Sequence, residues 1–273
     1  MDTVASAVSA SELSSLLGSP RAPLIVDVRR ATDFDADPQM LAAALRRPPD
    51  RVSVWSLSLP ERRSIVAYCS RGREQSREVA TVLLNGGVEA RYLEGGIEAW
   101  RAEGRLTITK QPQLGFSSEL PTRWITRERP KIDRIACPWL IRRFIDPLAE
   151  FLYVPPKQVV PLAARHRAVP YDVPDVDFSH EGDLCSFDTF LKRFGLNDRV
   201  LHGLAPIVRG ADTARLSLAP QAAGLLAVSL GLSALFEDDH EMLEHGMLVY
   251  DALFAWLRSA QDEVHNARLF EKR

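Results

Sequence analysis

The sequence predicts an α/β domain with a mostly parallel sheet, followed by an α+β, mainly helical domain. Its length of 273 residues suits two domains of ordinary size. The first half alternates short apolar runs with helix signals, which is the pattern of parallel strands joined by crossover helices. The second half contains longer helical patterns, with a proline-rich stretch at 155–179 that we expect to be irregular.

The predicted elements of the first half are short. Continuous apolar runs predict strands at 24–28, 64–69 and 90–93. Helices are predicted at 9–17, which opens with the capping-box spacing Ser9-x-x-Glu12, at 76–84, which stops at Asn85-Gly86-Gly87, and at 95–100.

The second half is predicted to hold one strand, at 151–154, and helices at 133–145, 186–194, 200–210, 220–236 and 238–259. Residues 111–123 show no periodicity, so we place a linker there. The predicted domains are therefore 1–110 and 124–273.

The composition excludes several classes of protein. The chain is 46% apolar and 26% charged with a net charge of −2, which argues against disorder and gives no global attraction to nucleic acid or a membrane. Three widely spaced cysteines indicate a reducing compartment rather than a disulfide framework. The first residues lack a signal segment, and the apolar stretch 222–235 is shorter than the roughly 20 residues of a membrane span. We expect a soluble cytoplasmic protein with no membrane partner.

Cys69 ends a predicted buried strand just before a helix. Backbone N–H groups at the start of that helix, with nearby arginines, favour the thiolate and can hold an anion delivered to the sulfur. The alternative is a small buried hydrophobe at a strand end, but the loop chemistry favours a reactive cysteine. A phosphatase-type loop is disfavoured, because it needs an arginine where Gln75 stands. The candidate active-site loop is Ser70, Arg71, Gly72, Arg73, Glu74 and Gln75.

Three motifs follow one another within residues 9–106: Asp27-Val28-Arg29, then Tyr68-Cys69 at the start of a C-x-x-G loop, then Tyr92-Leu93-Glu94-Gly95-Gly96 with Trp100. In this order they resemble the rhodanese family of sulfurtransferases. The resemblance implies a rhodanese-like fold and a persulfide on Cys69. It also implies a small-molecule or protein sulfur donor, a thiol acceptor, no required cofactor, and supporting roles for Asp27 and Arg29.

Glu74 departs from the usual rhodanese loop, C-x-x-G-x-R-S, because it stands where that loop has an arginine. A carboxylate there disfavours a dianionic donor, so we expect thiosulfate to be a poor substrate unless Arg73 compensates. A protein persulfide or a small thiol is then the more natural partner.

Charge is uneven in the second half, which is basic over 121–170 and acidic over 171–273. Arginine forks suit tetrahedral oxyanions, although a basic face paired with the acidic region explains the pattern equally well. The candidate oxyanion ligands are Arg127, Lys131, Arg134, Arg142, Arg209 and Arg215.

Histidines and carboxylates gather in two segments, 178–188 and 237–245. Mixed nitrogen and carboxylate ligands suit iron, manganese or zinc. Acidic residues at a helix start also occur simply because they complement the helix dipole, so both interpretations stay open. The candidate metal ligands are His180, Asp188, Asp239 and His240.

Residues 124–258 contain long segments that resemble the C-terminal domain of the chromate-resistance ChrB family. These segments are 128–144, 178–180, 208–215, 238–240 and 250–253. The resemblance implies a role in sensing or resisting chromate or a similar oxyanion. Some members are transcriptional regulators with another N-terminal module, and because a rhodanese-like module stands there in this chain, we do not expect nucleic-acid binding.

Three functions follow from the sequence. The first is a sulfurtransferase linked to chromate or oxyanion resistance. The second is a chromate-responsive sensor or regulator whose rhodanese domain is catalytically weak. The third is a metal-dependent enzyme in the helical domain.

Overall fold

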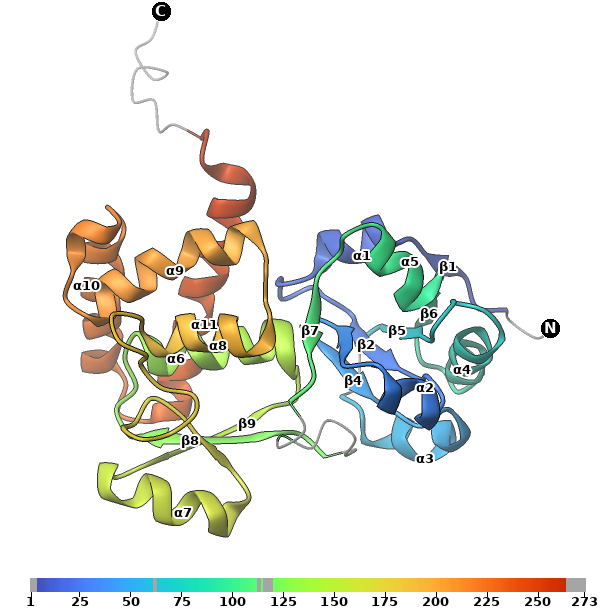
Figure 1. The fold of residues 1–273 in the computed structure, drawn as a ribbon, viewed down its shortest axis with the longest axis horizontal. Helices are drawn as coiled ribbons and strands as arrows, with labels where there is room; N and C mark the ends of the chain where they lie inside the picture. The colour runs from blue at the N-terminus through green and yellow to red at the C-terminus, as the bar shows by residue number, and fades with distance from the viewer. Residues whose placement is uncertain (1–3, 61–62, 112–113, 115–119, 264–273) are drawn as a thin grey trace, which may run out of the picture.

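The computed structural model describes residues 4–60, 63–111, 114 and 120–263. Two units lie side by side, the first coloured blue to green and the second green to red (Figure 1). The first is an α/β unit with a parallel sheet and the second is rich in helices, so the predicted fold class is confirmed.

The N-terminal unit is built on a five-stranded sheet of order β1-β6-β5-β2-β4 in which every pair is parallel. The strands are β1 (Ala7–Val8), β2 (Leu24–Asp27), β4 (Ala44–Arg46), β5 (Ile65–Tyr68) and β6 (Ala90–Leu93). The helices are α1 (Ala10–Leu16), α2 (Ala31–Ala36), α3 (Val52–Trp55), α4 (Glu74–Asn85) and α5 (Gly96–Ala102). The central strands β2 and β5 are buried along their whole length, as their continuous apolar runs predict.

The C-terminal unit packs helices around a small parallel sheet of order β10-β8-β9. Its strands are β8 (Arg123–Arg127), β9 (Glu150–Val154) and β10 (Val169–Pro170). Its helices are α6 (Asp133–Leu140), α7 (Val159–His166), α8 (Ser186–Phe194), α9 (Arg199–Asp212), α10 (Ala222–Leu235) and α11 (Asp239–Ala255). Helices α6 and α11 continue as π-helical turns at Ile141–Ile145 and Trp256–Ala260.

The stretch 155–179 is less irregular than expected, because it contains α7. Pro161 lies in the first turn of that helix, where a missing N–H group breaks no intrahelical hydrogen bond. A two-stranded antiparallel pair, β3 (Gln39–Leu41) with β7 (Thr107–Thr109), was also not predicted. The predicted linker 111–123 falls partly outside the described residues.

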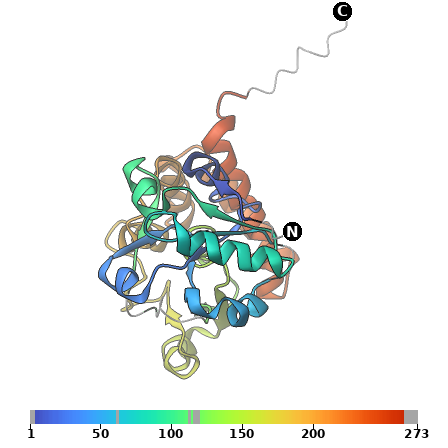
Figure 2. The same ribbon diagram turned by 90° about the vertical axis from the view of Figure 1, so that its right-hand side faces the viewer.

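The two units share one hydrophobic core; they lie side by side in Figure 1, and in the view of Figure 2 the first unit lies in front of the second. A side chain on Gly18 of the first unit would meet Phe144 at 2.5 Å and Phe254 at 2.7 Å in the second. The Arg258 guanidinium donates to the carbonyls of Ser14 and Leu17 at 3.0 and 2.9 Å. The π-helical turn Trp256–Ala260 is thereby attached to α1.

Within the described residues, no helix combines the length and apolar character that a bilayer crossing requires.

Candidate functional site

Cys69 follows β5 directly, and α4 begins five residues later. The start of α5 fixes the loop between them, because Ile97 N–H donates to the Cys69 carbonyl and Glu98 N–H to the Ser70 carbonyl, both at 3.1 Å. With these carbonyls engaged, N–H groups farther along the loop are directed toward the cysteine sulfur.

Two glycines make this loop arrangement sterically feasible. Gly72 and Gly96 both have positive φ, at +62° and +59°. A Cβ on Gly96 would lie 2.6 Å from the Gly72 nitrogen, and a Cβ on Gly72 would lie 2.6 Å from the Gly95 nitrogen. Close packing therefore requires the glycine of the C-x-x-G motif, since any side chain at Gly72 would collide with the turn before α5.

The thiol of Cys69 is set up to ionise. Burial raises its pKa, but hydrogen bonds from the Ser76 hydroxyl and from the N–H groups of Ser76, Arg73 and Arg71 outweigh burial and lower the pKa below its usual value. The sulfur lies 3.3 Å from the Ser76 oxygen.

Cys69 lies at a pocket of about 820 Å³. Arg71 is paired with Glu98 across 3.2 Å at the rim. More carboxylates than guanidinium groups line the pocket, so its wall carries no excess of positive charge. The charged lining residues are Arg30, Asp33, Asp50, Arg71, Arg73, Glu74, Glu78 and Glu98.

Asp27 and Arg29 form a buried ion pair, with Arg29 Nη2 at 2.6 Å from Asp27 Oδ2. The Tyr68 hydroxyl donates to the same oxygen at 2.5 Å, and Arg29 Nη1 also contacts Asp37 at 2.7 Å. These contacts join the carboxyl ends of β2 and β5, where the Cys69 loop begins.

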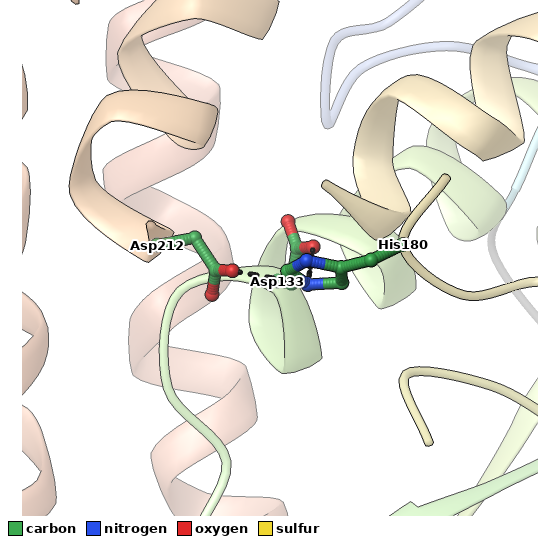
Figure 3. A group of neighbouring side chains, drawn as sticks. All are labelled: Asp133, His180 and Asp212. Atoms are coloured by element: carbon green, nitrogen blue, oxygen red, sulfur yellow. Dashed lines mark ion pairs between the residues drawn. The ribbon is translucent and has the colours of Figure 1, made fainter. Parts of the chain in front are cut away.

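A second polar cluster lies in the C-terminal unit, around His180 (Figure 3). His180 Nε2 is 3.2 Å from Asp212 Oδ2, 3.4 Å from Asp172 Oδ1 and 3.5 Å from Asp133 Oδ2. Asp133 is the first residue of α6, Asp212 is the last of α9, and His180 lies in the loop before α8. One imidazole nitrogen thus faces three carboxylates from separate segments.

Neighbouring groups orient these carboxylates. Ser186 N–H donates to Asp133 Oδ2 at 2.5 Å, and the Ser186 hydroxyl donates to Asp172 Oδ1 at 2.8 Å. Arg127 and Arg134 both contact Asp172 Oδ2, at 2.8 and 3.4 Å. Asp133 Oδ1 is different, because it is buried and has no hydrogen-bond partner among the described residues.

The cluster shifts the protonation of its members. Its three carboxylates, Asp133 first, raise the pKa of His180 to about 12. Burial raises the pKa of Asp133 to about 7. Burial also raises the pKa of the Cys137 and Cys185 thiols, so both are neutral and lack the activation seen at Cys69.

Family models match both units. Residues 9–103 match the rhodanese-like domain, and residues 124–257 match the domain described as ChrB, C-terminal domain. The protein joins a rhodanese-like domain to a ChrB C-terminal domain. It is 35% identical over 137 residues to Protein ChrB of Cupriavidus metallidurans, a match that covers 50% of this chain. The match covers 41% of that relative, so less than half of its length is represented here.

Two solved structures are also similar. A rhodanese-related protein from Thermoplasma volcanium is 20% identical, with a TM-score of 0.34, and the match covers 38% of this chain and 99% of that one. A rhodanese-like domain protein from Staphylococcus aureus is 27% identical, with a TM-score of 0.31, over 35% of this chain and 90% of that one.

The four candidate metal ligands of the ChrB domain do not come together. Asp188 accepts from Arg209 at 2.8 Å, Asp239 accepts from the Arg129 N–H at 3.1 Å, and the His240 ring packs 5.4 Å from that of Tyr153. Only His180 belongs to a set close enough to hold an ion, and its companions there are Asp133 and Asp212. Sequence spacing gave no signal for these two, since they lie 47 and 32 positions from His180.

Five of the six candidate oxyanion ligands are paired with carboxylates of the ChrB domain itself. Arg127 and Arg134 contact Asp172, Arg142 contacts Glu244, Arg209 contacts Asp188, and Arg215 contacts Asp183. For Lys131, the described residues contain no carboxylate oxygen within 4 Å. Three of these arginines, Arg127, Arg134 and Arg142, lie in the basic segment 121–170, and each is paired with a carboxylate of the acidic region that follows it.

Proposed function

We propose that the protein is a sulfurtransferase in which Cys69 carries sulfur as a persulfide. The observation that carries the proposal is the lowered pKa of Cys69, produced by N–H groups and the Ser76 hydroxyl around a sulfur at an open pocket. The rhodanese-like domain model supports the same reaction.

The proposed reaction has two steps, and Cys69 takes part in both. The Cys69 thiolate attacks the outer sulfur of a donor, the donor's sulfur–sulfur bond breaks, and the donor remainder leaves with the electron pair. An acceptor thiolate then attacks the outer sulfur of the Cys69 persulfide. That step breaks the persulfide bond and restores the Cys69 thiolate.

The charges around the pocket indicate the class of donor. Carboxylates such as Glu74 and Glu78 outnumber the guanidinium groups, and Arg71 is already paired with Glu98. A dianion such as thiosulfate is repelled by such a lining, whereas the persulfide group of a small thiol or of a protein carries at most one negative charge. We therefore assign a persulfide as the preferred donor.

The ChrB C-terminal domain supports a role for this sulfur transfer in resistance to chromate or a similar oxyanion, with the protein acting under oxyanion stress. This assignment comes from the family that the domain resembles, and it concerns the cellular process rather than the chemistry at Cys69.

A Cys69→Ser variant of the full chain tests the proposal. Sulfur transfer from glutathione persulfide and from thiosulfate should fall at least about a thousandfold, because the nucleophile is gone. Mass spectrometry should show one added sulfur atom on the wild-type protein and none on the variant. Cys137→Ala, which removes a buried neutral thiol, is the matched control and should retain transfer. Transfer that survives in Cys69→Ser from both donors contradicts the proposal.

The carboxylate-rich pocket also favours a second function, a chromate-responsive sensor with a catalytically weak rhodanese domain. This function predicts that chromate raises the Tm of the protein while turnover is absent with every donor. Turnover without a chromate-dependent Tm shift contradicts it.

A further inference from the structure

We propose that Asp133, His180 and Asp212 form a binding site for one divalent transition-metal ion in the ChrB domain. His180 Nε2 and one oxygen from each carboxylate are the ligand atoms. This site is separate from Cys69, so the proposal is independent of sulfur transfer.

The distances between the three candidate ligand atoms fit a metal site. Nε2 lies 3.2 Å from the Asp212 oxygen and 3.5 Å from the Asp133 oxygen, and a ligand atom from each of the three residues lies within 4.8 Å of the others. In a tetrahedral site with bonds of about 2.0–2.2 Å, neighbouring ligand atoms are about 3.4 Å apart. The side chains are therefore already spaced as metal ligands, while a single N–H on Nε2 can point directly at only one of the oxygens.

The second argument is the unsatisfied oxygen of Asp133. This side chain is 0% exposed, and in the part of the chain that the structure describes its Oδ1 atom has no hydrogen-bond partner. A buried carboxylate oxygen without a donor is unfavourable, and native structures rarely keep one without a reason. Oδ2 is the Asp133 oxygen that lies 3.5 Å from His180 Nε2, and the Ser186 N–H fixes it in place. A cation bound by this carboxylate also lies close to Oδ1 and supplies the interaction that Oδ1 lacks.

Asp172 is a positioning residue rather than a ligand. It is 3.4 Å from Nε2, but Arg127, Arg134 and the Ser186 hydroxyl already engage its two oxygens. Groups of this kind orient ligands in metal sites. Ser186 donates to both Asp133 and Asp172, so it links the proposed ligand Asp133 to the positioning residue Asp172.

The ligand set indicates which ions fit. One imidazole with two carboxylates suits Mn²⁺, Fe²⁺ and Zn²⁺, since it mixes the nitrogen donor preferred by zinc and iron with oxygen donors preferred by manganese. The His180 side chain is 41% exposed and that of Asp212 is 18% exposed. Three protein ligands with access to solvent leave a position for water or a small anion, which is the arrangement of catalytic rather than structural sites.

The test uses the full chain, stripped with a chelator, in wild-type and Cys69→Ser forms so that the reactive thiol is accounted for. Equilibrium dialysis against Zn²⁺, Mn²⁺ or, without oxygen, Fe²⁺ is followed by elemental analysis. We expect one equivalent of at least one of these ions. His180→Ala and Asp212→Asn should weaken its binding at least about tenfold. Both side chains are partly exposed, so these variants are expected to fold.

His240→Ala and Asp239→Asn are the matched controls, because they remove the same residue types outside the cluster. They should bind the ion as the wild type does. With Co²⁺ as a probe, the site should give visible d–d absorption without thiolate charge transfer, and His180→Ala should abolish it. Absence of stoichiometric binding, or binding that is unchanged in both His180→Ala and Asp212→Asn, overturns the proposal.

Discussion

Cys69 lies in the loop that leads into α4, Asp133 is the first residue of α6, and each receives a hydrogen bond from a backbone N–H group. Their environments differ. Cys69 lies at a pocket of about 820 Å³, and its pKa is lowered. Asp133 is enclosed, close to His180 and two further carboxylates, and burial raises its pKa. Hydrogen bonds from N–H groups therefore do not by themselves determine whether the pKa of an acidic group falls. Burial and neighbouring charges determine the direction of the pKa shift.

The two sites also differ in how they are assembled. Backbone groups of one short loop form most of the Cys69 site, whereas side chains from four separate segments form the His180 cluster. A shared core joins the two units, so a change in one can reach the other through packing.

Phe254→Ala should destabilise the protein most. Its ring packs against Trp139 and Phe144 and lies next to Gly18 of the other unit. Truncating a buried phenylalanine costs about 3–5 kcal/mol, because it leaves a cavity. Urea denaturation measures the loss. Leu248→Ala, at a position of α11 that is 68% exposed, is the control and should change stability by less than about 0.5 kcal/mol. Equal losses in both variants would contradict the buried position of Phe254.

Gly96→Ala should damage both stability and sulfur transfer. The new Cβ would lie 2.6 Å from the Gly72 nitrogen at a φ of +59°, so the loop must shift. We expect a loss of at least about 2 kcal/mol and of about a hundredfold in transfer rate. Gly87→Ala is the matched control. Gly87 also has a positive φ, +82°, but a Cβ at this position would meet no atom of the described residues within 4 Å. If the two variants lose the same stability and activity, the positive φ rather than the contact with the loop is the reason that position 96 requires glycine.

Ser76→Ala should raise the pKa of Cys69, because the hydroxyl stabilises the thiolate. The thiolate is the reactive form, so the rate of alkylation by iodoacetamide at neutral pH should fall by up to about tenfold, and its pH profile should move to higher pH. Ser15→Ala, at an exposed serine of α1, is the control. An unchanged pH profile in Ser76→Ala would show that the Ser76 hydroxyl does not lower the pKa of Cys69.

Glu74→Arg should have the smallest effect, because the charge is at the pocket wall and partly screened. Replacing a carboxylate by a guanidinium should raise kcat/KM for thiosulfate a few-fold and leave a small-thiol persulfide donor almost unaffected. The gain should shrink as salt is added. A gain that is equal for both donors would mean that charge is not the discriminating property.

The strand, loop and helix around Cys69 could be predicted from the sequence because they are local. The strand, the C-x-x-G loop and the helix follow one another without interruption, and the spacing itself carries the chemistry. The contact between Gly72 and Gly96 was not predictable, since it depends on how α5 returns to the loop. In the first unit, the buried strands were also recognised from their continuous apolar runs.

The His180 cluster was only partly predictable because its members are far apart in the chain. His180 was singled out for its acidic neighbours, yet Asp133, Asp172 and Asp212 join it through folding of α6, α9 and the segment after β10. Asp188, Asp239 and His240 were chosen from local spacing, and each has another partner in the structure. Strand β8 was missed because charged arginines stand at both of its ends.

The contact of Gly18 with Phe144 and Phe254 has a consequence for attempts to separate the two families in this chain. Each family model covers one unit, which suggests two portable modules that could be expressed apart. Here an isolated N-terminal half would expose the apolar surface around α1, and an isolated C-terminal half would leave Phe254 and Arg258 without their counterparts. The boundary between families is therefore not a boundary between independently folding units, and a cut near residue 115 should yield aggregation-prone fragments.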